Sequence, residues 1–140
     1  MCNFALIGAV APREKLREVL ENAGNDFDTD RVPDAAALAL FPALNEVVCV
    51  TSGGCSCALL EGVGLSTRAR NEAHAAGPGY AFRRALAEMV LRFGEVQLLA
   101  FSAARAPTLA TGLPERSTTL GNFLRFGLQS HDGLVRIVAG

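Results

Sequence analysis

An apolar stripe at helical spacing, bounded by glycine on both sides, constrains the fold of this chain most strongly. The stripe consists of Phe82, Ala85, Leu86, Met89, Val90 and Phe93. Apolar residues three and four positions apart lie on one face of an α-helix, so the segment predicts a helix packed on a core. Gly77-Pro78-Gly79 precedes it and Gly94 ends it. The apolar run at 95–101 then predicts a buried strand.

The N-terminal part repeats this pairing of strand and helix in the opposite order. Residues 3–10 read as a buried strand, and Pro12 suits the first position of a helix. The helix is predicted from an apolar stripe of Leu16, Val19, Leu20 and Ala23, and Gly24 ends it. Further on, Asp34 is expected to cap a short helix over 35–41.

The C-terminal residues alternate as a β-hairpin would. Asp132-Gly133 is a favoured tight-turn pair, and apolar residues fall on one face of the two predicted strands. These residues are Leu124, Phe126, Leu128, Val135 and Ile137. The order of elements therefore predicts a single α/β (α+β) domain over residues 1–140. Its mixed, largely antiparallel sheet would pack against helices and close with a C-terminal hairpin.

Composition narrows the classes of protein to which the chain can belong. Half of the 140 residues are apolar, the net charge is −1 and no block of like charges occurs, so we expect no nucleic-acid partner. No apolar run approaches the roughly 20 residues of a membrane helix, so we expect no membrane partner. The first residues lack the basic region of a secretory signal. We therefore expect a cytoplasmic protein with reduced or metal-bound cysteines.

Three of the four cysteines occur where core packing is a poor explanation. Cys2 follows the first methionine, and Cys55 and Cys57 flank one serine after Gly53-Gly54. Two apolar runs around the glycine pair predict a β-hairpin over 46–60. That register pairs Ser52 with Cys55 and Val50 with Cys57. It also places both cysteines on one face, and Cys49 on the other face as a small core residue.

The favoured hypothesis is a thiol cluster of Cys2, Cys55 and Cys57 that binds a soft metal such as zinc. Thiolates are the ligands that such metals prefer. Side chains two apart on a strand are about 6.6 Å from each other, whereas two sulfurs on one zinc are about 3.8 Å apart. Shared ligation by Cys55 and Cys57 therefore requires the hairpin to bend.

Other functions remain open at the level of sequence. The chain could be a non-catalytic interaction module that binds another protein or a second copy of itself through 66–79 or 103–118. It could be a thiol-redox protein, in which the N–H groups of Gly53 and Gly54 stabilise a Cys55 thiolate. Cys2 could also act as an N-terminal nucleophile. No catalytic residue is identified, so whether the chain is an enzyme stays open.

The opening Met1-Cys2-Asn3-Phe4 and the later motif over 51–57 (TSGGCSC) together resemble a group of uncharacterised bacterial proteins. Those proteins begin Met-Cys with an aromatic residue nearby and later carry Gly-x-Cys-x-Cys. Several have a histidine before the first cysteine of that motif, where this chain has Gly54. The resemblance implies a bacterial origin and places Cys2, Cys55 and Cys57 in one site. It implies no particular activity.

Overall fold

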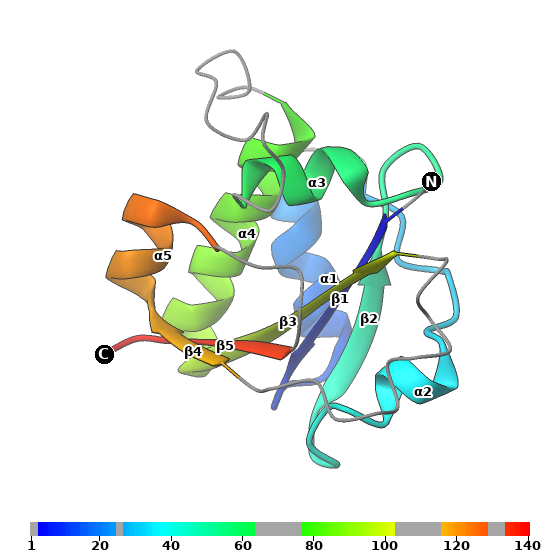
Figure 1. Cartoon of the computed structure of the whole chain (residues 1–140), viewed down its shortest axis with the longest axis horizontal. Coiled ribbons are helices and arrows are strands. Elements are labelled where there is room, and N and C mark those ends of the chain that lie inside the picture. Colours follow the sequence, from blue (N-terminus) through cyan, green and yellow to red (C-terminus); the bar gives the residue numbers. More distant parts are fainter. Residues whose placement is uncertain (1–2, 25–26, 64–76, 103–115, 129–133) are drawn as a thin grey trace.

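Five strands form one mixed sheet in the computed structural model, which describes residues 3–24, 27–63, 77–102, 116–128 and 134–140 (Figure 1). The strands are β1 (Asn3–Ala9), β2 (Glu46–Val50), β3 (Glu95–Ser102), β4 (Arg116–Thr119) and β5 (Leu134–Val138). Their order across the sheet is β2-β1-β3-β5-β4. Neighbouring strands are antiparallel except β4 and β5, which are parallel. The predicted mixed, largely antiparallel sheet is confirmed.

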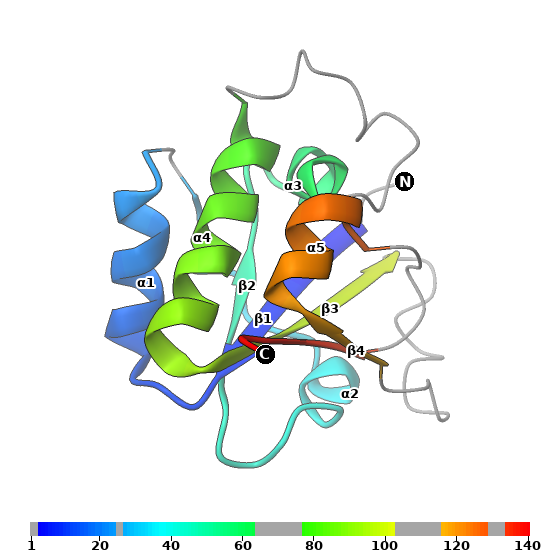
Figure 2. The same ribbon diagram turned by 90° about the vertical axis from the view of Figure 1, so that its left-hand side faces the viewer.

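Helices cover the two faces of the sheet unequally (Figure 2). The helices on one face are α1 (Arg13–Asn22), α3 (Cys57–Gly62), α4 (Pro78–Phe93) and α5 (Leu120–Phe126). The short α2 (Ala35–Leu38) packs on the other face. None of the helices in the described ranges is long and apolar enough to span a membrane.

Side chains of β1 alternate between two apolar clusters. Ala5, Ile7 and Ala9 point into the larger cluster, which the four helices cover. Phe4 and Leu6 point into the smaller cluster on the opposite face. Successive residues of a strand face opposite sides of a sheet, so this central strand is buried on both faces. Its nearly continuous apolar sequence follows from that position.

The helix predicted from the longest apolar stripe is confirmed as α4. Its buried side chains include Phe82, Ala85, Leu86, Met89 and Val90. Pro78 lies in its first turn, and Gly94 after its last turn has φ +88°, a conformation that favours glycine. Asp34 caps α2 as predicted, and its carboxylate accepts the N–H groups of Ala36 and Ala37. The capped helix ends at Leu38, three residues earlier than expected.

The predicted C-terminal hairpin is wrong. Residues 120–126 form α5, and the strand before it, β4, pairs with β5 in parallel. The Thr119 hydroxyl caps α5 by accepting the Asn122 N–H at 3.2 Å. Phe123 is fully buried on the helix, whereas Leu124 and Phe126 are 40% and 56% exposed. Burial of Phe123 and the Thr119 cap thus favour a helix over the strand that the alternating apolar residues predicted. The Asp132-Gly133 turn lies outside the described residues.

Two glycines allow α3 and α4 to pack backbone to backbone. A Cβ atom on Gly62 would overlap the carbonyl group of Gly79, and one on Gly79 would lie 2.7 Å from the Ala58 carbonyl oxygen. Real side-chain contacts do not come this close, and the obstructing atoms are backbone atoms that cannot rotate away. The position of α3, which begins at Cys57, therefore depends on the absence of side chains at this crossing.

We expect Gly62→Ala to lower the free energy of unfolding by about 3 kcal/mol, at the upper end of the cost of overpacking, because backbone must move. Gly121→Ala is the matched control. Gly121 lies in α5 with nothing within 4 Å of its missing Cβ, so alanine there should be neutral or stabilise by up to about 1 kcal/mol. Urea unfolding followed by circular dichroism measures both. Equal stability of the two variants would contradict the backbone contact.

Candidate functional site

The chain between β2 and α3 makes a tight turn at Gly53-Gly54. Both glycines have positive φ, +70° and +92°, and both are exposed. The Ser52 N–H donates to the Cys55 carbonyl at 2.9 Å, so the predicted pairing of these two residues is confirmed. The predicted hairpin stops there. Cys57 begins α3 instead of pairing with Val50, and the expected strand over 55–60 is wrong.

Ser56 carries the hydrogen bonds that end the hairpin. Its side chain is completely buried, and its hydroxyl accepts the Ala5 N–H at 2.9 Å and donates to the Val50 carbonyl. Its own N–H donates to the Asn3 carbonyl at 2.8 Å. Its carbonyl accepts the Leu60 N–H, the first hydrogen bond of α3. Ser56 thus joins β1, β2 and α3, a role that sequence reasoning missed.

The sulfur of Cys57 lies against the first described residue of β1. Cys57 Sγ accepts a hydrogen bond from the Asn3 N–H at 3.3 Å, within the range for a sulfur acceptor. The two residues are 54 positions apart in the chain. Cys2, the residue next to Asn3, lies outside the described residues. The contact therefore brings Cys57, a predicted site residue, against Asn3, which follows Cys2 in the chain.

Cys55 and Cys57 do not share a strand face, so that prediction is wrong. Cys55 is half-buried and packs against the smaller apolar cluster. Cys57 is also half-buried but opens α3, and α3 covers the opposite face through Leu59 and Leu60. The start of α3 at Cys57 interrupts the two-residue period of a strand, which would have placed both side chains on one face.

Cys49 is a core residue, as predicted. It is 2% exposed and belongs to the smaller cluster, the one against which Cys55 also packs. Burial raises the pKa of the Cys49 thiol, the Arg31 guanidinium opposes this shift, and the Asp28 carboxylate adds to it. A protonated, buried thiol is a poor nucleophile and a poor metal ligand. Burial and a raised pKa thus distinguish the Cys49 thiol from those of Cys55 and Cys57. The predicted difference in face is wrong for Cys55, which packs against the same cluster as Cys49.

No group of three potential metal ligands among His, Cys, Asp and Glu gathers within the described ranges. The predicted cluster needs Cys2 as its third ligand, and Cys2 is outside those ranges. The alternative interaction surfaces lie mostly outside them too. Within 66–79 only 77–79 are described, where α4 begins, and within 103–118 only 116–118, which belong to β4.

Comparison with protein-family models, with curated proteins and with solved structures finds no match for this chain. The contacts of its own residues must therefore carry any functional proposal.

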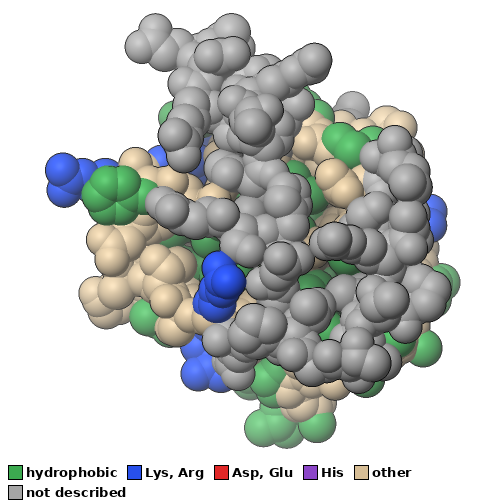
Figure 3. Space-filling view, viewed as in Figure 1, with side chains coloured by type: hydrophobic (Ala, Val, Ile, Leu, Met, Phe, Trp, Pro, Cys, Tyr) green, Lys and Arg blue, Asp and Glu red, His purple; other side chains and the backbone are tan. Residues whose placement is uncertain are grey.

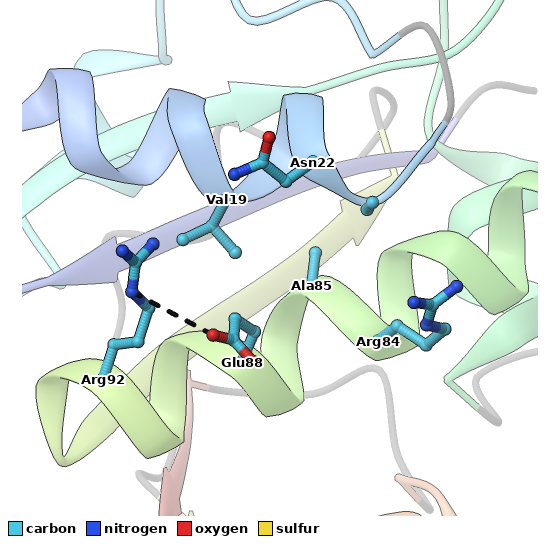
Figure 4. Close-up of a pocket in the computed structure, with 7 residues that line it drawn as sticks. Val19, Asn22, Arg84, Ala85, Glu88 and Arg92 are labelled. Carbon is cyan, nitrogen blue, oxygen red and sulfur yellow. Dashed lines mark ion pairs between the residues drawn. The ribbon is translucent and has the colours of Figure 1, made fainter.

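A groove between α1 and α4 has charged side chains in its walls (Figure 4). Arg92 pairs with Glu18 of α1 at 3.6 Å and with Glu88 of its own helix at 4.0 Å. Two carboxylates thus offset the Arg92 charge, and the pairs connect the helices. Exposed pairs of this kind contribute little to stability.

A second hollow lies on the opposite face of the sheet, between the ends of β1 and β3 and the segment at 31–34. Phe4, Cys49 and Phe101 line it together with Arg31. Sequence reasoning did not find this hollow. Arg31 has no apolar pattern around it, and its place over the sheet depends on the isolated pairing of Asp28 with Thr51, which turns the chain there.

We expect Ser56→Ala to lower the free energy of unfolding by about 1–3 kcal/mol, because it deprives the buried Ala5 N–H and Val50 carbonyl of a shared partner. Ser52→Ala is the control, since no hydrogen bond of the Ser52 side chain occurs among the described residues. That variant should change stability by less than about 0.5 kcal/mol. Urea unfolding measures the stability of both variants. If Ser56→Ala unfolds at the same urea concentration as the unmodified chain, the Ser56 hydroxyl is not needed for stability.

The three described cysteines should differ in reactivity. We expect iodoacetamide at pH 8 to modify Cys55 and Cys57 at least about tenfold faster than Cys49, since Cys49 is buried and its raised pKa keeps it protonated. Mass spectrometry of timed, quenched samples measures the rates. In urea the difference should disappear. Modification of Cys49 in the folded protein at the rate of the other two would refute its assignment to the core.

Proposed function

We propose that the chain holds one soft metal ion, zinc being the reference case, through Cys2, Cys55 and Cys57. The hydrogen bond from the Asn3 N–H to Cys57 Sγ carries the proposal. Consecutive Cα atoms are about 3.8 Å apart across a trans peptide bond, so the covalent chain keeps the Cys2 backbone close to the Cys57 sulfur. Cys55 lies two residues before Cys57, at the end of the Gly53-Gly54 turn.

The chemistry of this corner suits a thiolate-bound metal. Thiolates are the preferred ligands of zinc and copper(I), and backbone N–H groups commonly donate to metal-bound sulfurs as outer-shell partners. The Asn3 N–H is such a donor. The Gly53-Gly54 turn beside the thiols is exposed, and nothing lies within 4 Å of either missing Cβ. An ion therefore has an open approach.

Binding would require Cys55 to turn away from the apolar cluster that it touches. Cys55 follows two glycines in positive-φ conformations, and glycine allows backbone rotations that other residues resist. Ser56 and Cys57 are held by hydrogen bonds to β1. We therefore expect the metal to reorganise the turn at 53–55 and to leave the start of α3 in place.

We expect the reduced protein, purified without a metal-affinity tag, to bind one zinc ion per chain. Cys57→Ser should lower the affinity at least about tenfold, because one thiolate ligand is lost, and Cys2→Ser should do the same. Cys49→Ala is the matched control and should bind as the unmodified chain does. Isothermal titration calorimetry and elemental analysis measure affinity and stoichiometry.

Two results would contradict the metal proposal. One is the absence of stoichiometric metal together with free titration of the Cys2, Cys55 and Cys57 thiols. The other is equal affinity of the Cys57→Ser and Cys49→Ala variants. If oxidant instead links two of the cysteines and thiol reductant reverses the link, the thiol-redox alternative accounts for the site.

A further inference from the structure

The hollow on the smaller-cluster face combines an apolar floor with one guanidinium group. Its volume is about 210 Å³. Phe4, Leu6 and Phe101 form the floor, and all three are buried in the smaller apolar cluster. Val32, on the rim, is 85% exposed. Apolar side chains also gather at the lower edge of this view of the surface, around α2 and the loop after it (Figure 3).

Arg31 is the cation that lines this hollow. Its guanidinium carbon lies 4.0 Å from the centre of the Phe4 ring. No ion pair of Arg31 occurs within the described part of the chain, whereas the neighbouring Asp30 pairs with Arg17. Asp34 also lines the hollow, but its Oδ1 accepts two backbone N–H groups at the start of α2. Within the described part of the chain no carboxylate therefore pairs directly with the Arg31 guanidinium, although the Asp34 carboxylate keeps its charge in the same lining.

The dimensions set the size of a suitable ligand. A protein cavity of about 150 Å³ lined by apolar side chains holds benzene, so about 210 Å³ accommodates one ring with one small substituent. An arginine beside an apolar floor selects a carboxylate for that substituent, because its planar donors match the two carboxylate oxygens.

We infer that this hollow is a binding site for a small organic anion made of one apolar ring and one carboxylate. The ring packs between the edge of Phe101 and the exposed Val32, above the buried Leu6, and the carboxylate pairs with Arg31. The site is separate from the proposed thiol cluster and does not depend on it.

Sodium benzoate is the probe. We expect saturable binding with a Kd on the order of 1 mM, as befits a ligand of so few atoms. Benzamide, which has the same shape without the charge, should bind at least about tenfold more weakly. Isothermal titration calorimetry measures both affinities. Shifts of the Leu6 and Val32 methyl signals in NMR spectra locate the ligand.

Arg31→Gln removes the charge from an exposed side chain and should weaken benzoate binding about tenfold. Arg84→Gln makes the same change on α4, in the groove on the other face, and should leave binding unchanged. The inference is overturned if benzoate does not saturate the unmodified protein by about 20 mM, some twentyfold above the expected Kd. Equal binding of benzamide, or full binding by Arg31→Gln, overturns it as well. The comparison of benzoate with benzamide needs no variant.

Discussion

The buried hydroxyl of Ser56 is the group on which one whole end of the sheet depends. Beyond Val50 the chain leaves β1, since Thr51 pairs with Asp28 instead. The end of the β1–β2 ladder therefore needs polar partners from elsewhere, because buried backbone groups left without hydrogen bonds are costly. Ser56 meets Ala5, Val50 and Asn3 at once and starts α3 with its own carbonyl. Ser56, between the two cysteines, thus has a structural role. Its hydrogen bonds fix the backbone of this segment and therefore the positions of Cys55 and Cys57.

Contacts at the C-terminal end of α3 also fix the position of Cys57, the first residue of this helix. A helix of six residues is too short to be stable by itself in water. Tertiary contacts hold α3: Ser56 at its start, and Gly62 against Gly79 of α4 at its end. The Val63 carbonyl just after it accepts the Leu128 N–H at 2.7 Å. The Asn3–Cys57 contact therefore joins two rigid parts, while the glycine turn before them is the adjustable one.

Sequence patterns correctly predicted an element where a long stretch fitted the period of a helix and not that of a strand, or where a capping residue was clear. The stripe of α4 continues over three turns, and Asp34 has an unambiguous cap geometry in α2. Prediction failed over 55–60 and 120–126, because short apolar runs fit both the strand period and the helix period. There the deciding contacts come from distant residues: β1 for Ser56, and the core of the larger cluster for Phe123. The thiol positions could be named from the sequence, but their directions depend on those contacts. The Arg31 hollow forms where four segments meet, namely β1, 31–34, β2 and β3, and no local sequence pattern indicates it.

The Asn3–Cys57 contact and the Arg31 hollow lie on opposite sides of the first residues of β1. Asn3 and Ala5 bond through their backbone to the Ser56–Cys57 segment, whereas the Phe4 ring between them points to the Arg31 hollow. Strand alternation thus separates the sites sterically while one stretch of backbone connects them. A metal that tightened the Asn3 contact would restrain Phe4 and reduce the entropy that a ligand must lose on binding beside it. The backbone from Asn3 to Ala5 therefore connects the two sites without a shared residue.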